Sequence, residues 1–217
     1  MSIEIHVSTG LEIEPQIFLA AQSLLQGEII IFPTETVYGI AADAENDQAI
    51  EHLISIKHRP DNKPFPVMVK DISMAETLAD LGMAREIAKD FWPGPLTLIL
   101  PAKSHLSDAC IHEGTIGIRC PNHPIAQAIL RIAGIPLAVP SANESGAPPA
   151  TQTIEARRIF PQKDIAFRIY QQNQTQGQPT TILKIEPDTW TILRKGPVSA
   201  QTIRSYLPQG VTLNEQP

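Results

Sequence analysis

The stretch from Ile29 to Ala44 reads IIIFPTETVYGIAADA, an apolar run that ends at a proline and opens into hydrogen-bonding side chains. Its first four residues are β-branched or aromatic, which is typical of a strand buried on both faces. Pro33 has no N–H to donate and ends the strand; the polar residues that follow are Thr34, Glu35, Thr36 and Tyr38. Core strands of α/β proteins carry ligand sites at their tips. The stretch therefore predicts a ligand site, and the alternative is an ordinary strand-to-helix loop with threonine and glutamate as helix caps.

Strand-like and helix-like segments alternate along all 217 residues, which predicts an α/β fold with a mixed sheet. The expected strands are 3–7, 29–32, 65–69, 96–100, 115–119, 136–140, 166–170, 180–185 and 189–194. The expected helices are 15–26, 47–56, 74–90 with a break at Gly82, 123–133, 153–160 and 200–207. The last two strands flank a Glu-Pro-Asp turn and predict an antiparallel hairpin. Residues 1–210 are expected to form a single domain and residues 211–217 a frayed tail.

Composition narrows the class of protein. The net charge of −6 argues against broad binding of nucleic acid, although a local basic cleft is compatible with it. The two cysteines, Cys110 and Cys120, lack metal-binding spacing and are expected to be free thiols in a reducing compartment. The first residues do not resemble a signal peptide, and no apolar run approaches the roughly 20 residues that span a bilayer. A cytoplasmic protein without a membrane segment is expected.

A cluster of cations follows the second expected helix, in the segment IKHRPDNKP at positions 56–64. Its basic residues are Lys57, His58, Arg59 and Lys63. Arginine offers a two-pronged donor and lysine a point charge, so the cluster predicts a clamp for phosphate or carboxylate. The alternative is a solvated helix end, where cations complement the helix dipole. Pro60 and Pro64 stiffen the segment and favour the clamp.

Two further stretches place polar side chains beside strands. In GTIGIRCPNHP (114–124), Thr115, Gly117 and Arg119 alternate onto one strand face, which predicts an open face with an anion-binding arginine. In PLAVPSANESGAPPAT (136–151), an apolar strand again ends at a proline and opens into polar residues, among them Ser141 and Asn143. Two strands that end alike predict two neighbouring tips that share one crevice. The alternatives are a surface arginine and a proline-rich surface loop.

Several common catalytic motifs are missing from the sequence. It contains no GxxxxGK[ST] phosphate loop, no GxGxxG turn, no GxSxG elbow and no HExxH pair. A hydrolase serine and a bound zinc are therefore not expected. A nucleotide, if bound, would be held by scattered lysine, arginine, serine and threonine side chains.

Seven stretches, in the same order, resemble the YrdC-type (TsaC-type) threonylcarbamoyl-AMP synthases. They are PTETVYG (33–39), KHRP with Lys63 after it (57–63), WPGPLTLIL (92–100), TIGIRCPNHP (115–124), PSANESG (140–146), GQPTTIL (177–183) and LRKG (193–196). Each stretch is weak alone, but seven in order are specific. The resemblance implies a YrdC-like α/β catalytic domain in its short, single-domain form. Its twisted, largely parallel mixed sheet would have flanking helices around a basic concave cavity.

The resemblance also implies the reaction. L-threonine, bicarbonate and ATP would give threonylcarbamoyl-AMP and pyrophosphate, and the product would feed threonylcarbamoyladenosine modification of tRNA next to the anticodon. Mg²⁺ would arrive with ATP, with no organic cofactor and no metal site of the protein's own. The implied partners are these small-molecule substrates and a downstream tRNA threonylcarbamoyl-transferase complex. A weak contact with tRNA is compatible with the resemblance. The alternatives are an RNA-binding module without catalysis and a carbamoyl-adenylate-forming enzyme, as in a related domain of hydrogenase-maturation proteins.

Site residues carry over position by position from the resemblance. The catalytic residues would be Lys57, at the phosphate or bicarbonate end, and Arg59. ATP would contact Arg59, Lys63, Thr115, Ser141, Asn143, Pro149 and Arg194. Threonine would contact Thr36, Arg119, Val139 through its backbone, and Thr180.

The sequence departs from the family pattern at three positions. Met68 stands where some relatives have a histidine, Thr180 replaces a commoner serine, and Lys63 stands where other members carry asparagine. The histidine contact is therefore expected to be lost, the hydroxyl to be kept, and the attraction for phosphate to be stronger. Residues 171–178 are a candidate lid on composition alone. Glu35 fits a helix cap and a ligand contact equally well.

Overall fold

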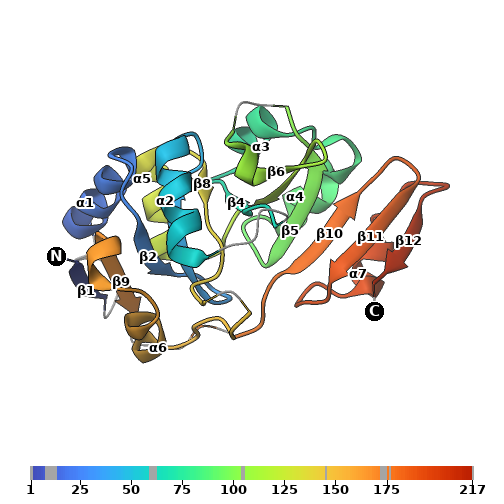
Figure 1. The fold of residues 1–217 in the computed structure, drawn as a ribbon. Helices are drawn as coiled ribbons and strands as arrows, with labels where there is room; N and C mark the ends of the chain where they lie inside the picture. Colours follow the sequence, from blue (N-terminus) through green and yellow to red (C-terminus); the bar gives the residue numbers. More distant parts are fainter. Residues whose placement is uncertain are drawn as a thin grey trace.

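The computed structural model describes residues 2–7, 14–58, 63–103, 106–144, 146–171, 175 and 177–216. Figure 1 shows helices packed around a long twisted sheet, with the two termini at opposite ends of the molecule. The strands are β1 (Ile3–Val7), β2 (Ile30–Pro33), β3 (Tyr38–Asp43), β4 (Val67–Met68), β5 (Leu96–Pro101), β6 (Ile111–His112), β7 (Thr115–Arg119), β8 (Leu137–Ala138), β9 (Phe167–Gln171), β10 (Thr181–Ile185), β11 (Thr189–Arg194) and β12 (Thr212–Glu215). The helices are α1 (Glu14–Leu25), α2 (Asp47–Lys57), α3 (Ile72–Leu78), α4 (Arg85–Phe91), α5 (Pro124–Ala133), α6 (Thr153–Arg158) and α7 (Ala200–Arg204), with 3₁₀ turns at Gly82–Ala84, Asp108–Cys110 and Gln162–Asp164.

The strands lie in the order β1-β9-β2-β3-β8-β4-β7-β5-β10-β11-β12, and β6 pairs with β7 outside this path. Parallel pairs join β1 to β9, β9 to β2, β4 to β7, β5 to β10 and β11 to β12. The other neighbours are antiparallel, including the expected β10–β11 hairpin. The predicted α/β class and mixed sheet are confirmed, with parallel and antiparallel pairs in similar number.

The apolar β2 strand is buried because helices cover both of its faces (Figure 1). Ile31 belongs to the core that includes Leu53 of α2. Its neighbour Ile30 belongs to a second core, which includes Ile17 of α1 and Ile129 of α5. Side chains alternate across a strand, so consecutive apolar residues serve the two cores in turn.

Local signals fix the ends of the helices that lead to the site. Asn46 caps α2 by accepting a hydrogen bond from the Ala49 N–H at 3.2 Å. His58 ends the same helix in the left-handed conformation, with φ of 46°. Pro124 occupies the first turn of α5, and Gly134 ends it with φ of 70°. The helix end at His58 fixes where the preceding Lys57 emerges.

The structure corrects two expectations about secondary structure. The polar turn after β2 leads into β3 rather than directly to a helix, and β3 pairs back on β2 with Pro33 opposite Tyr38. The expected frayed tail is wrong for Thr212–Glu215, because these residues form β12 and pair with β11. In Figure 1 this strand closes the far end of the sheet beside α7. Among the described residues, no helix is long and apolar enough to cross a membrane.

Candidate functional site

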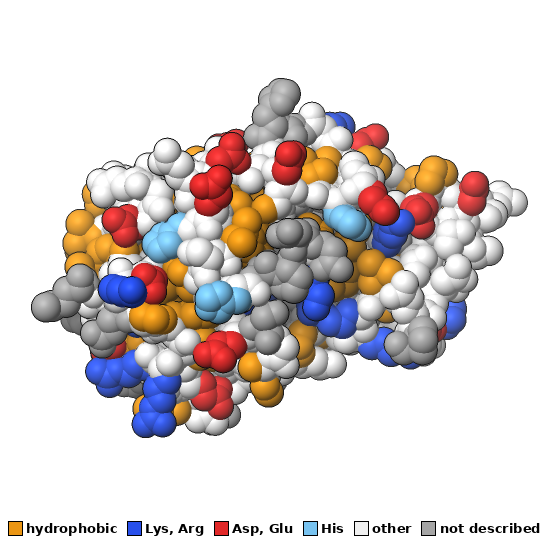
Figure 2. Space-filling view, in the orientation of Figure 1, with side chains coloured by type: hydrophobic (Ala, Val, Ile, Leu, Met, Phe, Trp, Pro, Cys, Tyr) orange, Lys and Arg blue, Asp and Glu red, His pale blue; other side chains and the backbone are white. Residues whose placement is uncertain are grey.

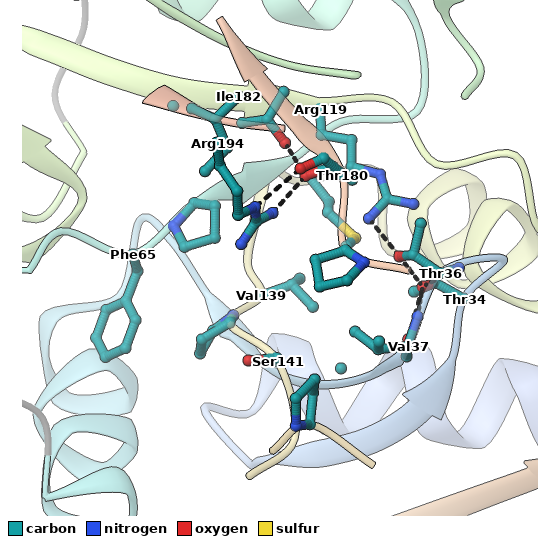
Figure 3. Close-up of a pocket in the computed structure, with 18 of the residues that line it drawn as sticks. Thr34, Thr36, Val37, Phe65, Arg119, Val139, Ser141, Thr180, Ile182 and Arg194 are labelled. Atoms are coloured by element: carbon teal, nitrogen blue, oxygen red, sulfur yellow. Dashed lines mark hydrogen bonds between the residues drawn. The ribbon is translucent and has the colours of Figure 1, made fainter. Parts of the chain in front are cut away.

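A cavity of about 440 Å³ lies where the tips of several strands meet (Figure 3). Its floor is one face of three neighbouring strands, β10, β5 and β7. Its walls come from the turn between β2 and β3, the segment before β4, and the loop after β8. Gly39 bridges to Ser141, which places the two proline-ended strand tips side by side as the sequence predicts. Small-molecule sites commonly have volumes of about 300–1,000 Å³, so the cavity suits a small-molecule ligand.

Strand alternation separates the cavity from the core. On β7, Thr115, Gly117 and Arg119 line the cavity, whereas Ile116 and Ile118 belong to the apolar core. The neighbouring strand β5 turns Thr97 and Ile99 to the cavity, and Ile182 of β10 joins them. The alternation of side chains from one face to the other accounts for this arrangement. The open strand face predicted around Arg119 is confirmed.

The turn that follows β2 is held rigidly by its own hydroxyl groups. Thr34 Oγ1 accepts hydrogen bonds from the N–H groups of Thr36 at 3.2 Å and Val37 at 3.3 Å. It also donates to the Val37 carbonyl at 2.6 Å. Threonine side chains stabilise tight turns in this way. The buried hydroxyl of Thr36 is therefore presented to the cavity in a fixed position.

Arg119 is buried and points into the cavity (Figure 3). Its Nη1 donates to Thr36 Oγ1 at 3.0 Å, and its Nη2 forms an ion pair with Glu35 Oε1 at 2.7 Å. The same carboxylate oxygen accepts from the Asn122 N–H at 2.9 Å. Burial lowers the pKa of Arg119, and the Glu35 carboxylate opposes this by raising it. Glu35 is thus the counter-ion that keeps a charged guanidinium in place, not a helix cap.

Replacing Glu35 by glutamine is expected to lower the free energy of unfolding by about 3 kcal/mol, because breaking a buried ion pair leaves an unbalanced charge. The two side chains are only 7% and 11% exposed. Glu76→Gln is the matched control, since the Glu76–Arg85 pair is 38% and 48% exposed and should contribute less than about 1 kcal/mol. Urea unfolding of both variants measures the difference. Equal losses would show that the Glu35–Arg119 pair contributes no more than a surface pair.

A second arginine, which is more exposed than Arg119, faces the cavity from the end of β11. Arg194 donates to the Thr180 carbonyl at 2.9 Å through Nε and to Thr180 Oγ1 at 2.7 Å through Nη2. Thr180 Oγ1 lies 2.9 Å from Thr97 Oγ1. The pKa of Arg194 is lowered first by burial and then by the charge of Arg119. The cavity therefore holds two guanidinium groups beside one carboxylate, an arrangement that attracts anions.

Lys57 at the end of α2 is bound by the loop after β8, and its expected role beside the phosphates or bicarbonate stays a prediction. Its Nζ donates to the carbonyl oxygens of Ser141 at 2.7 Å and Asn143 at 2.6 Å, and to Asn143 Oδ1 at 3.2 Å. The side chain is buried, so the solvated helix end is wrong for this residue. A buried ammonium group needs hydrogen-bond acceptors, and the loop after β8 supplies them. Lys57 therefore holds this loop and does not itself line the cavity.

The loop after β8 also carries its own hydrogen bonds. Ser141 Oγ donates to Asn143 Oδ1 at 2.6 Å, and Asn143 Nδ2 donates to the Ala147 carbonyl at 2.7 Å. Ser141 lines the cavity, whereas Asn143 is half-buried, is not among the lining residues and accepts a hydrogen bond from Lys57. The expected contact of Asn143 with a ligand stays a prediction, and its observed partners give it a supporting position.

Most of the predicted site residues meet in this one cavity. Its lining includes Thr36, Thr115, Arg119, Val139, Ser141, Pro149, Thr180 and Arg194. The exposed Lys63 is not part of the lining, and Arg59 lies outside the described residues. Met68 also lies on the cavity wall. The N–H of Val139 donates to the Pro66 carbonyl at 2.9 Å, which leaves the Val139 carbonyl as its backbone group for a ligand.

Thr34, expected in the polar turn, lines the cavity beside Thr36. Thr97 was not expected there, yet it lines the cavity and lies within hydrogen-bond distance of Thr180. A threonine between leucines in the strand run LTLIL was the available signal for Thr97.

Among the described residues no cluster of three or more histidine, cysteine or acidic side chains could hold a metal ion. The candidate lid lies partly outside the described residues; within it, the Gly177 N–H donates to the Thr36 carbonyl at 2.9 Å.

Figure 2 shows one face of the molecule, on which acidic and basic side chains are interspersed. The described cations of the cavity are the two arginines, Arg119 and Arg194, and no described lysine lines it. The basic character of the cavity thus comes from two guanidinium groups, that of the buried Arg119 and that of the more exposed Arg194. This arrangement fits a small anionic ligand better than the backbone of a nucleic acid.

Comparisons with known proteins identify the family of the chain. The Sua5/YciO/YrdC family model, described as "Telomere recombination", matches residues 22–196. The threonylcarbamoyl-AMP synthase of Bacillus subtilis (strain 168) is 37% identical over 204 residues, which cover 89% of this chain and 57% of that protein. A putative threonylcarbamoyl-AMP synthase of Mycobacterium tuberculosis (strain ATCC 25618 / H37Rv) is 36% identical over 192 residues, covering 87% of each chain.

The fold has a close counterpart among solved structures. The crystal structure of Pyrococcus abyssi Sua5 complexed with L-threonine matches with a TM-score of 0.89 and 31% identity, covering 98% of this chain and 62% of that chain. The chain thus spans a little over half the length of the B. subtilis and P. abyssi proteins. The family model, the sequence identity and the fold agree, and the chain belongs to the Sua5/YciO/YrdC family.

Proposed function

We propose that the protein is an L-threonylcarbamoyladenylate synthase, which converts L-threonine, bicarbonate and ATP into threonylcarbamoyl-AMP and pyrophosphate. The observation that carries this proposal is the one cavity whose lining combines the buried Arg119 and Thr36 with Thr115, Ser141 and Arg194. Relatives that bear this enzyme name, and a Sua5 structure complexed with L-threonine, support it. One cavity would hold both the amino acid and the nucleotide.

The amino-acid end would be formed by Arg119 and the hydroxyl groups beside it. A guanidinium group binds a carboxylate with paired hydrogen bonds, and Glu35 already fixes Arg119 in orientation. Thr36 and Thr180 would supply hydroxyl contacts, and Val37 and Val139 an apolar wall for the methyl group of threonine. Threonine would therefore bind with its carboxylate toward β7.

The nucleotide end would be formed by Thr115, Ser141, Pro149 and Arg194. Arg59 and Lys63, beyond the end of α2, would add positive charge for the phosphates. Lys57 would act through the loop that it holds. Mg²⁺ would enter bound to ATP, because its preferred ligands are phosphate and carboxylate oxygens. No organic cofactor is needed for the chemistry.

In the proposed reaction, the amine of threonine and bicarbonate first give an N-carboxylate and water. One carboxylate oxygen then attacks the α-phosphorus of ATP. A new P–O bond forms, the bond to the bridging oxygen breaks, and pyrophosphate leaves with the electron pair. The protein would position the reactants and balance charge that develops on the phosphates. Exclusion of water would protect the carbamate and the mixed anhydride from hydrolysis.

The product would be the donor for threonylcarbamoylation of tRNA next to the anticodon, by a downstream transferase complex in the cytoplasm. Threonylcarbamoyl-AMP is a reactive mixed anhydride, so an acceptor enzyme must consume it promptly. The cavity itself has the size of a small-molecule site. Any contact with tRNA would therefore be weak and outside the cavity.

The test is to incubate the protein with ATP, Mg²⁺, bicarbonate and threonine and to follow the product by mass spectrometry. We expect threonylcarbamoyl-AMP and pyrophosphate only when all four are present. Release of pyrophosphate without RNA excludes an RNA-binding module without catalysis. Carbamoyl-AMP from carbamoyl phosphate, with no product from threonine, would point instead to a carbamoyl-adenylate-forming enzyme. Absence of any adenylate would contradict the proposal.

A further inference from the structure

Gly117 lies in the interior of β7, on the floor of the cavity and midway between Thr115 and Arg119. Glycine weakens the interior of a strand, because it loses more conformational freedom on folding and has no side chain to pack. Its presence there requires a reason, which is usually a bulge, a bend, or the close approach of a ligand or another backbone segment. Its register with Ile99 of β5 is regular, so no bulge is involved.

Neither the backbone nor the packing requires glycine at this position. Gly117 is not among the glycines with positive φ, and an added Cβ would meet Thr97 Cγ2 at 3.8 Å and Ile99 Cγ1 at 3.9 Å, which are ordinary contacts. The ten other described glycines are different: seven have positive φ, and at three an added Cβ would come within 3.0 Å of another atom. Among the described glycines, Gly117 alone has room and an ordinary conformation for a side chain.

We infer that Gly117 is a size-determining residue that keeps the middle of the cavity floor open for the group in which the two substrates join. This inference rests on the proposed function. Residues rise about 3.3 Å apiece along a strand, so Thr115 and Arg119 are separated by about 13 Å, with Gly117 about 7 Å from each. With ATP at Thr115 and the amino-acid carboxylate at Arg119, the carbamate and the α-phosphate lie over Gly117. The missing side chain lets them rest directly on the sheet.

The test compares Gly117→Ala and Gly117→Val with the wild-type protein. We expect Gly117→Ala to keep the wild-type melting temperature or raise it, because alanine fits and restricts the unfolded chain. The rate of threonylcarbamoyl-AMP formation at saturating ATP and threonine should fall at least about 10-fold, and about 100-fold for Gly117→Val, because small misplacements of reacting groups have effects of this size. Calorimetric affinities for ATP alone and threonine alone should change less than the rate.

Gly114→Ala is the matched control. Gly114 lies in the turn just before β7 and outside the cavity lining, with φ of +72° and no atom near an added Cβ. Alanine at this φ is strained, so this variant should lose melting temperature and keep the rate below its transition. Gly117→Ala is thus expected to lose rate and keep its melting temperature, whereas Gly114→Ala is expected to lose melting temperature and keep its rate.

Three outcomes would overturn the inference. A Gly117→Ala protein with the wild-type rate would show that the floor needs no free space. A lowered melting temperature in that variant would show that Gly117 serves the fold. A wild-type protein that forms no threonylcarbamoyl-AMP would overturn the proposed function and the inference together. If the wild-type protein and Gly117→Ala form the product at the same rate, only the inference fails.

Discussion

Arg119→Ala is expected to weaken the binding of threonine at least ~100-fold while the affinity for ATP changes about threefold or less. Hydrogen bonds to charged groups contribute about 1.5–3 kcal/mol each, and a guanidinium can make two to one carboxylate. Arg119 is buried and held in a fixed orientation by Thr36 and Glu35, so its replacement by alanine removes a positioned pair of donors. Isothermal titration with threonine and with ATP measures both effects. An unchanged affinity for threonine would remove Arg119 from the amino-acid end.

The same substitution leaves the carboxylate of Glu35 buried without its counter-ion, which by itself destabilises a protein. The double variant Glu35→Ala with Arg119→Ala removes both charges and controls for this effect. A folded double variant that still fails to bind threonine supports direct binding by Arg119. Arg119→Lys is a second control, because lysine keeps the charge but not the paired geometry and should give an intermediate loss.

Lys57→Ala is expected to lower threonine-dependent release of pyrophosphate at least ~100-fold, a magnitude known for lost charge contacts in active sites. Its ammonium group holds the carbonyls of Ser141 and Asn143, so its removal frees the loop that presents Ser141. Lys89→Ala is the matched control, since Lys89 is a surface residue paired with Glu86. Near wild-type turnover of Lys57→Ala would contradict the prediction.

A double-mutant cycle separates the two ways in which Lys57 could act. If Lys57 acts through the loop, Lys57→Ala and Asn143→Ala remove parts of one unit, and their effects on the rate should not add. If Lys57 meets the phosphates independently, the effects should add. The hydrogen bonds of 2.6 and 3.2 Å between Lys57 and Asn143 favour strong coupling.

Local patterns in the sequence were sufficient for much of the site. Thr115, Gly117 and Arg119 share a face because side chains alternate along a strand. Their spacing of two positions in the sequence was enough to predict this shared face. The two proline-ended strands were expected to have neighbouring tips, and the Gly39–Ser141 bridge confirms it. The β10–β11 hairpin was also expected from its turn residues and is confirmed.

Other features depend on contacts between distant parts of the chain, which local patterns do not specify. Glu35 and Arg119 are 84 positions apart, and nothing near either residue indicates the other. The buried position of Lys57 depends on acceptors in a loop more than 80 residues away. β3 was missed because its apolar residues follow the polar turn so closely that they read as its continuation, and β12 because its residues are mostly polar.

Arg194 donates hydrogen bonds to Thr180, and Thr180 shares a hydrogen bond with Thr97, so these contacts would link the two proposed ends of the cavity thermodynamically. A nucleotide that draws Arg194 toward its phosphates weakens its hold on Thr180, and an amino acid that engages Thr180 alters the partners of Arg194. Linkage requires such an influence to be reciprocal. If the proposed function holds, the affinity for either substrate would depend on whether the other is present, and these hydrogen bonds would influence the order in which the two bind.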